Sequence, residues 1–207
     1  MDLSIPKTRI GLMGGSFNPI HLGHLLLAQT ALHDFSLSRV IFIPTGKPGY
    51  PVKETPLPGE IRFQMVLLAI ASNPDFFASR LEVDREKPCF TIDTLHEIRK
   101  EYPDSQFDFY YITGADAILE ILSWKNPEEI LHLTSFIAGT RPNYSLTNFF
   151  EKISVLKEAK EKINLMNIPM LDISSSEIRK NIRSGKSIRY MVTDEVLHFI
   201  EKNKLYV

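Results

Sequence analysis

The chain has 207 residues, of which 43% are hydrophobic and 24% charged, and its 24 Lys and Arg against 25 Asp and Glu leave a net charge of −1. This balance excludes the broad basic surface of a protein that coats nucleic acid, although a local basic pocket can still form. The single cysteine excludes an internal disulfide, and neither a membrane-length apolar run nor a signal-peptide core is present. We therefore expect a soluble, cytoplasmic protein with one sizeable core and no nucleic-acid or membrane partner.

The first motif lies between a strand pattern and a helix pattern. Residues 8–13 are a short apolar stretch typical of a buried strand, and an apolar pattern of helical length runs from residue 25 to about 35. Between them stands Gly-Gly-Ser-Phe-Asn-Pro-Ile-His-Leu-Gly-His, residues 14–24. The pattern predicts a turn at the carboxyl edge of a parallel sheet, where ligands bind in open α/β folds. Gly14 and Gly15 would let the backbone approach a ligand, and helix-start amides favour an anion such as phosphate.

Two histidines end this motif. His21 and His24 are three residues apart, so they project from one face of the predicted helix, and Gly23 leaves room beside them for a bulky ligand. Imidazoles beside a phosphate-binding turn can stabilise the charge that develops in nucleotidyl transfer. Zinc binding is the alternative, but no Cys, Glu or third His stands at ligand spacing, so we expect no protein-bound metal. Histidines that merely pack would be the default for one alone, but not for a pair in this glycine-rich frame.

The rest of the chain alternates between strand and helix patterns. Strands are predicted at residues 39–44, 76–86, 106–113, 135–139 and 168–173. Helices are predicted at residues 59–73, 91–102, from 115 through Trp124, 146–163, from 174 onwards and 193–202. The alternation predicts an α/β fold with a doubly wound parallel sheet and three α/β/α layers. The segment 45–60 holds four prolines and Lys53, and its length favours a functional loop.

Three later segments add polar residues at the same predicted sheet edge. Gly114 and Asp116 follow a strand, as do Arg141 and the run Ser174-Ser175-Ser176-Glu177-Ile178-Arg179. A first-turn acid favoured by the helix dipole would explain Asp116, and a capping box would explain Ser174 and Glu177. Neither explanation accounts for three serines together with an arginine.

These motifs resemble the nucleotidyltransferase superfamily that carries His-x-Gly-His, and most closely its bacterial nicotinate-mononucleotide adenylyltransferases. The resemblance covers nearly the whole chain. It includes Gly-x-Asp followed by Trp124, and Ser-Ser-x-x-Ile-Arg near the end. The chain departs from the family pattern at a few positions. It has Asn18 for Asp, Cys89-Phe90 for Ser-Tyr before Thr91, and Asn143 for Gly.

The resemblance implies transfer of AMP from ATP, accompanied by Mg²⁺, to nicotinate mononucleotide by direct in-line attack, with release of pyrophosphate. It implies charge neutralisation by His21, His24 and Arg179. It also implies ATP contacts at Gly14, Gly15, Ser16, Phe17, His21, His24, Gly114, Asp116, Ser174, Ser175, Ser176 and Arg179. For the mononucleotide it implies contacts at Ser16, Lys53, Phe90, Thr91, Trp124 and Arg141.

Several alternatives stay open. The same fold could act on nicotinamide mononucleotide or phosphopantetheine, or the chain could be a non-catalytic nucleotide-binding regulator. A regulator would have little reason to keep both histidines with Arg179. We expect one domain over residues 1–207, with residues 174–207 as a C-terminal helical part, and either a monomer or a homodimer.

Overall fold

The structure is a computed structural model, and it describes residues 6–52, 54–140, 153, 155–156, 159–169 and 171–207. In this part of the chain a parallel sheet of six strands has the spatial order β3-β2-β1-β4-β5-β6. The strands are β1 (Thr8–Gly15), β2 (Arg39–Pro44), β3 (Phe76–Ala78), β4 (Phe107–Gly114), β5 (Ser135–Thr140) and β6 (Ile163–Asn167). The strand order reverses between β1 and β4, and that switch point is where such sheets bind ligands.

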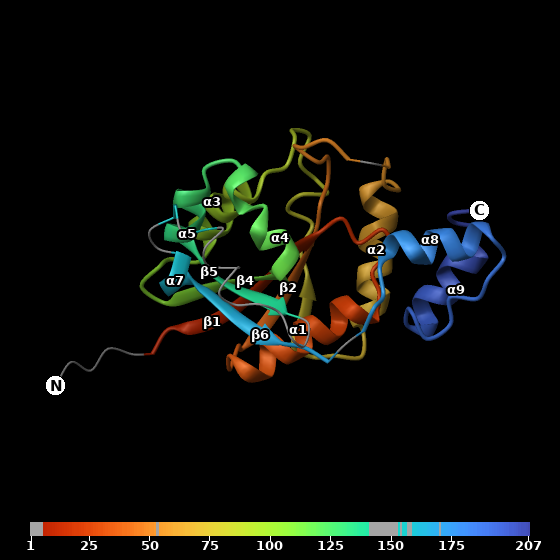
Figure 1. Ribbon diagram of the computed structural model, residues 1–207, viewed down its shortest axis with the longest axis horizontal. Helices are drawn as coiled ribbons and strands as arrows, with labels where there is room; N and C mark the ends of the chain where they lie inside the picture. Colours follow the sequence, from red (N-terminus) through yellow and green to blue (C-terminus); the bar gives the residue numbers. More distant parts are fainter. Residues whose placement is uncertain (1–5, 53, 141–152, 154, 157–158, 170) are drawn as a thin grey trace.

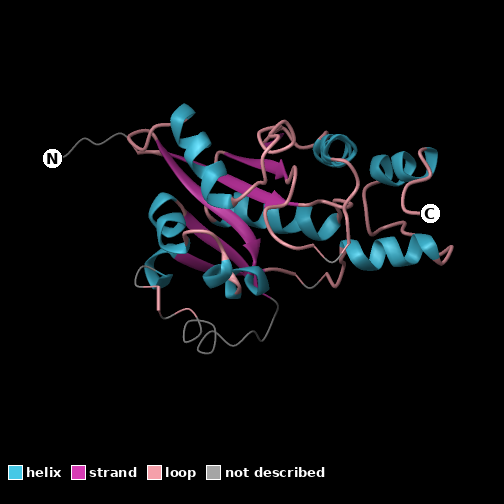
Figure 2. Ribbon diagram, turned by 90° about the horizontal axis from the view of Figure 1, so that it is seen from above, coloured by secondary structure: helices cyan, strands magenta, loops and turns pink. Residues whose placement is uncertain are grey.

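Helices cover both faces of the sheet (Figures 1 and 2). They are α1 (Leu22–Asp34), α2 (Gly59–Ile70), α3 (Thr91–Glu101), α4 (Ala115–Leu119), α5 (Pro127–Leu133), α7 (Ala159–Lys162), α8 (Ser175–Arg183) and α9 (Asp194–Lys202), with a 3₁₀ turn at Ile121–Ser123. None of the helices in the described part of the chain is long and apolar enough to cross a membrane.

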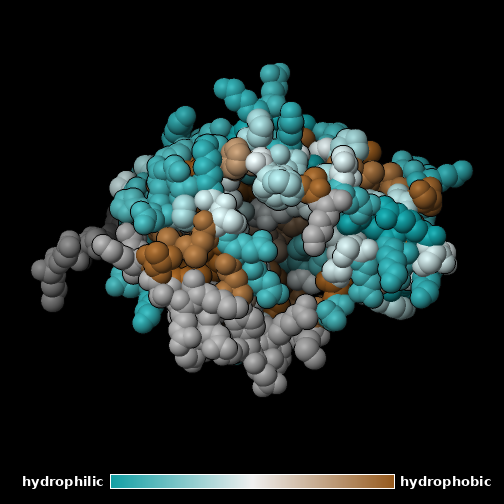
Figure 3. Space-filling view, turned by 45° about the horizontal axis from the view of Figure 1, so that its top comes forward, coloured by the Kyte–Doolittle hydropathy of each residue, from teal (hydrophilic) through white to brown (hydrophobic). Residues whose placement is uncertain are grey.

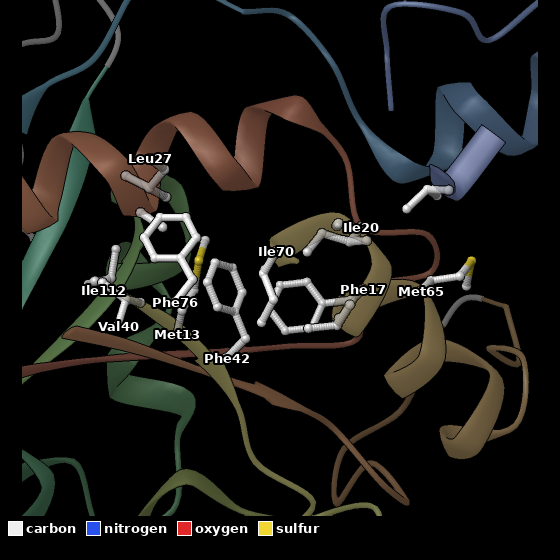
Figure 4. Packing of buried hydrophobic residues seen from close by; sticks show 14 of the residues in the cluster. Met13, Phe17, Ile20, Leu27, Val40, Phe42, Met65, Ile70, Phe76 and Ile112 are labelled. Carbon is white, nitrogen blue, oxygen red and sulfur yellow. The ribbon is translucent and has the colours of Figure 1, made fainter. Parts of the chain in front are cut away.

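Successive side chains along each strand point to opposite faces of the sheet, so the protein has two hydrophobic cores, one on each face of the sheet. In β1, Met13 belongs to the cluster under α1 and α2, whereas Ile10 and Leu12 belong to the cluster under α3, α4 and α5. Figure 4 shows the first cluster, where the rings of Phe42 and Phe76 lie 5.2 Å apart. These two cores confirm the predicted doubly wound α/β fold with three layers.

The C-terminal helices pack beyond α2 rather than on the sheet (Figure 1). Buried Ile178 of α8 and Val196 of α9 belong to the same cluster as Met65 of α2. Both helices begin with a capping side chain, since Ser174 accepts from the Glu177 amide and Thr193 from the Val196 amide. This packing brings residues near the end of the chain close to the motif near its beginning.

Several predicted element bounds are wrong. The strand expected over 76–86 ends at Ala78, and residues 81–84 form a turn in which the Asp84 amide donates to the Arg80 carbonyl oxygen at 2.9 Å. The helix expected from residue 115 through Trp124 breaks into α4 and the 3₁₀ turn, and a separate helix that was not predicted, α5, begins with Pro127.

The region before α8 was also predicted incorrectly. The expected strand 168–173 is not formed, and β6 lies just before it, at Ile163–Asn167. Its two buried residues, Ile163 and Met166, are three positions apart. This spacing is typical of a helix and differs from the alternating pattern by which a strand is recognised in a sequence. Of the helix expected over 146–163, residues 153 and 155–156 lie in turns, α7 covers only Ala159–Lys162, and the rest lies outside the described residues.

Candidate active site

The two motif histidines lie against each other at the start of α1. Their rings stack with centroids 3.7 Å apart, and the backbone N–H of His21 donates to Nδ1 of His24 at 3.2 Å. Nδ1 of a neutral His24 is therefore the acceptor, which leaves the ring proton on Nε2 as a hydrogen-bond donor. Nδ1 of His21 is buried without a hydrogen-bond partner. The pair thus holds polar groups that the protein itself does not satisfy.

Both histidines are neutral at physiological pH. Burial lowers the pKa of His21 to about 4. Part of the His24 surface stays accessible, but its ring contacts His21 and, edge-on at 5.1 Å, Phe17. Burial there, and secondarily the proximity of His21, lowers the pKa of His24 well below its usual value. The pair can therefore offer neutral N–H donors rather than fixed positive charges.

The glycines of the motif are required by packing. A Cβ at Gly14 would overlap the hydroxyl of Tyr111, and one at Gly15 would lie 3.3 Å from the Phe17 ring. A Cβ at Gly23 would lie 3.1 Å from the His21 ring, so the room at this position belongs to the histidine and not to a ligand.

Phe17 was predicted to contact ATP, but its side chain lies in the core. It is 2% exposed and packs 5.9 Å from the ring of Phe42 (Figure 4). Its backbone is left-handed, with φ of 45°, which is uncommon for a residue other than glycine. Only the backbone of Phe17 can therefore contact a ligand, and the buried ring fixes the turn.

Residues from α8 bind the carbonyl groups of this turn. The hydroxyl of Ser175 donates to the Pro19 carbonyl oxygen at 2.8 Å, and Nη1 of Arg179 donates to the Asn18 carbonyl oxygen at 2.8 Å. The hydroxyls of Ser174 and Ser176, both on exposed residues, lie 3.0 Å from each other. The structure therefore brings the serines and arginine of the late motif to the histidine motif.

Arg179 also pairs with a carboxylate from the proline-rich loop. Its Nε and Nη2 donate to Oε2 of Glu54 at 3.0 and 2.7 Å, and Arg183 pairs with Oε1 of the same group. The two arginines lower the pKa of Glu54 through their hydrogen bonds. Glu54 thus places a negative group on the arginine that was predicted to bind phosphate.

A cavity of about 680 Å³ opens beside the ends of β1 and β4. It meets the histidine motif at Gly14 and Gly15, and three of its other lining residues were predicted to bind the mononucleotide: Phe90, Thr91 and Trp124. Its size is within the range of small-molecule sites. The face of the molecule seen in Figure 3 is hollowed near its centre.

The start of α3 lies in the wall of this cavity. Phe90 is the N-cap residue and offers no capping side chain, so the first amides of the helix need another acceptor. Lys125 lies 4.8 Å from the centre of the Phe90 ring and donates to Asp93 at 3.0 Å. Trp124 is half-buried, with its ring edge-on to Tyr111 at 6.1 Å.

The remaining predicted residues are distributed around this edge or fall outside the description. Ser16 is exposed in the turn, Gly114 precedes α4, and Asp116 is exposed in the first turn of α4. Lys53, Arg141 and Asn143 lie outside the described residues. Within the described residues, no group of three or more His, Cys, Asp or Glu side chains is arranged to hold a metal ion.

Sequence reasoning gave no site role to the most buried cation here. Arg62 is 1% exposed and donates to the carbonyl oxygens of Leu57 at 2.7 Å and Ser16 at 2.6 Å, and also to that of Thr45. Burial lowers its pKa. It joins the histidine turn, the end of β2 and the proline-rich loop. Its position in the first turn of a helix, where a cation opposes the dipole, was the available signal.

The fold and the site together define an α/β protein that binds nucleotides at the switch point of a parallel sheet. A family model described as cytidylyltransferase-like matches residues 12–181, so the chain belongs to the cytidylyltransferase-like family. Proteins of similar sequence refine this class. The chain is 45% identical over 212 residues to the "probable nicotinate-nucleotide adenylyltransferase" of Moorella thermoacetica, covering 100% of this chain and 95% of that protein.

A second relative carries the same description. It is from Desulfitobacterium hafniense strain Y51, is 41% identical over 208 residues, and is matched over 100% of this chain and 99% of its own length. The resemblance inferred from the motifs is therefore confirmed.

Solved structures agree on the fold. Plasmodium falciparum nicotinic acid mononucleotide adenylyltransferase, complexed with APC, has a TM-score of 0.75 at 23% identity, with 96% of this chain and 97% of that chain covered. The same enzyme complexed with NaAD has a TM-score of 0.74 at 24% identity, with the same coverage.

Proposed function

We propose that this protein is a nicotinate-nucleotide adenylyltransferase, which transfers AMP from ATP to nicotinate mononucleotide and releases pyrophosphate. The observation that carries the proposal is the juxtaposition at one sheet edge. A stacked pair of neutral histidines ends the turn whose Asn18 carbonyl oxygen accepts from Arg179, and the cavity with an uncapped helix start adjoins the same turn. Sequence identity of 41–45% to proteins of that description, over the full chain, supports the same activity.

The histidine side of the site would bind the phosphates of ATP. Nε2–H of His24 can donate to a phosphate oxygen, and the other ring nitrogen of His21, Nε2, would give a second polar contact. The guanidinium of Arg179 would neutralise charge on the departing pyrophosphate. No residue needs to act as a nucleophile, because the mononucleotide phosphate attacks the α-phosphorus directly. Catalysis is then positioning and charge stabilisation.

Smaller ATP contacts would surround this centre. The exposed hydroxyls at the start of α8 and the amides of the turn are suited to phosphate oxygens. The proposed ATP-binding residues remain Gly14, Gly15, Ser16, the backbone of Phe17, Gly114, Asp116, Ser174, Ser175 and Ser176. Mg²⁺ would come with ATP and neutralise phosphate charge, and Asp116 offers the oxygen ligand that this ion prefers.

The cavity side would bind the mononucleotide. The first amides of α3, at Thr91 and after it, would receive the pyridine carboxylate, and Trp124 would stack on the ring. Lys53 and Arg141 are retained as candidate mononucleotide contacts from the sequence. We also propose a single domain over residues 1–207, a cytoplasmic location, and a monomer or homodimer.

A direct assay tests the proposal. The purified protein is incubated with ATP, Mg²⁺ and either nicotinate or nicotinamide mononucleotide, and pyrophosphate and the dinucleotide product are measured. We expect both products, with the nicotinate form preferred. ATP binding without turnover on either mononucleotide would favour a regulator, and turnover on phosphopantetheine alone would move the protein to the other adenylyltransferase class.

A further inference from the structure

We propose that Tyr206, the residue before the last in the sequence, is a positioning residue for adenylyl transfer and acts through Asn18 on the histidine turn and Arg179. The proposal rests on the proposed function, because Arg179 must bind ATP for its position to matter. It assigns a role in the reaction to a residue 188 positions away from the motif it supports.

Tyr206 reaches the turn from beyond the end of α9. Its hydroxyl donates to Oδ1 of Asn18 at 2.9 Å, and the backbone N–H of Leu57 donates to the same oxygen at 3.2 Å. Asn18 is only 5% exposed, so this oxygen has no easy replacement by bulk water. One buried amide oxygen therefore joins the histidine turn, the proline-rich loop and the C-terminal end of the chain.

The same asparagine contacts the proposed ATP-binding arginine through its backbone. The Asn18 carbonyl oxygen accepts from Nη1 of Arg179 at 2.8 Å. If loss of the contact with Tyr206 lets the Asn18 backbone shift, the carbonyl that holds the guanidinium shifts with it. Asn18 is also three residues before His21, whose ring is fixed by close packing. Tyr206 can therefore affect Arg179 and the histidine pair without touching the substrate.

Two further anchors of the turn come from the same C-terminal part of the chain, in addition to Arg62 and Leu57. Ser175 binds the Pro19 carbonyl, and the Leu22 amide donates to the Met191 carbonyl at 2.9 Å. The histidine turn is thus shaped from outside by α8, the segment before α9 and Tyr206. Its geometry depends on these long-range contacts, and Tyr206 is the contact nearest the end of the chain.

The Tyr206 side chain is suited to this role over the physiological pH range. Burial raises the pKa of its phenol, so the hydroxyl stays protonated and keeps donating. Its backbone is left-handed, with φ of 66°, which shows that the surroundings hold it in an uncommon conformation.

The test is Tyr206→Phe, which removes only the hydroxyl, with Tyr190→Phe as the matched control on a residue that is 81% exposed. Leaving the Asn18 oxygen short of one donor is expected to raise the KM for ATP about 5- to 20-fold and to lower kcat, while the KM for the mononucleotide stays unchanged. Loss of folded protein alone would lower kcat without moving the KM for ATP. The control is expected to match the unaltered enzyme.

Substitutions of Asn18 test whether Tyr206 acts through this residue. Asn18→Asp keeps an acceptor for both donors and should preserve the ATP dependence, whereas Asn18→Ala should reproduce the effect of Tyr206→Phe. The double variant of Asn18→Ala and Tyr206→Phe should be no worse than Asn18→Ala alone, because both act on one contact. Additive effects, or an unchanged KM for ATP in Tyr206→Phe, overturn the proposal.

A binding measurement separates this proposal from the proposed function. Calorimetric titration with ATP alone needs no turnover, and Tyr206→Phe should weaken the Kd for ATP by a similar factor. If the unaltered protein forms no product but this shift is observed, the proposed function fails and the positioning role stands. If the protein is active and the Kd is unchanged, the positioning role fails.

Discussion

The ring of His21 fills the space where a side chain at position 23 would stand. A Cβ added to Gly23 would lie 3.1 Å from both Cε1 and Nδ1 of that ring. The same ring stacks on His24 at a centroid distance of 3.7 Å. The absence of a side chain at Gly23 therefore helps to align the two histidine rings.

Gly23→Ala should consequently lower kcat while leaving the protein folded. Displacing the His21 ring by a few tenths of an ångström misaligns the stacked pair, and we expect a loss of about 10-fold or more, since positioning errors of this kind are costly. Steady-state kinetics would measure it. Gly59→Ala is the matched control, because its added Cβ meets only ordinary contacts, the nearest at 3.4 Å. Equal kinetics for both variants would contradict the alignment role.

Removing the His24 ring should lower the reaction rate more than the Gly23→Ala substitution does. His24→Ala deletes the Nε2–H that we propose donates to the ATP phosphates, and losing one such donor typically costs about 10²–10³ in rate. His33→Ala, at an exposed position with a side chain 86% accessible, should have normal kinetics. Near-normal turnover in His24→Ala would remove this residue from the proposed mechanism.

The buried His21 predicts a pH dependence of stability. Its pKa is about 4 in the folded protein against 6.5 in the unfolded chain. The stability that the neutral His21 ring contributes is therefore fully present above pH 6.5. It is lost as the pH falls toward 4, because over this range the proton is taken up by the unfolded chain and not by the folded protein. The loss is about 3 kcal/mol for this group, and the lowered pKa of His24 acts in the same direction.

Urea unfolding between pH 7.5 and pH 4.5 would measure this effect. His21→Ala should start less stable, since a buried ring is removed, but should lose less stability on acidification than the unaltered protein. His33→Ala should keep the full loss. An identical acid-induced loss in all three proteins would show that His21 does not carry it.

The Glu54 carboxylate is expected to compete with ATP for Arg179. It accepts two hydrogen bonds from the guanidinium, so the arginine must release it to bind a phosphate in the same place. Glu54→Gln should lower the KM for ATP by about 3- to 10-fold, because the competent state becomes more populated. Glu60→Gln, which affects only exposed contacts with Arg80 and Gln64, is the control. A raised KM would instead mean that Glu54 holds Arg179 in its active position.

The sequence could predict the part of the site that lies within a single strand–turn–helix segment. The strand, turn and helix around His21 and His24 follow from a short contiguous pattern, and the structure places the pair as the spacing indicates. The ligand space expected beside Gly23 was wrong, because a pattern shows which residue is small but not which neighbour uses the space.

Unlike those of the late serine and arginine motif, some contacts made over long sequence distances had no local signal. Tyr206 and Asn18 meet only because α8 and α9 fold back over α2, and neither residue is unusual in its own segment. Likewise, Glu54 stands in an irregular loop where no periodicity predicts its partner. The hydrophobic pattern determines the layers, whereas these polar contacts depend on the final arrangement of the layers.

The choice of mononucleotide gives the last prediction. Uncapped amides at the start of α3, with the helix dipole behind them, favour a carboxylate over a carboxamide, whose NH₂ would leave one donor unpaired. An unsatisfied buried donor costs about 1–3 kcal/mol, which predicts about a 5- to 150-fold preference for nicotinate mononucleotide in kcat/KM. Trp124 stacking does not distinguish the two rings, so Trp124→Ala should raise both KM values by similar factors. Kinetics with both substrates on both proteins decide this. Equal or reversed preference in the unaltered enzyme would refute the role of the α3 amides and leave adenylyl transfer itself untouched.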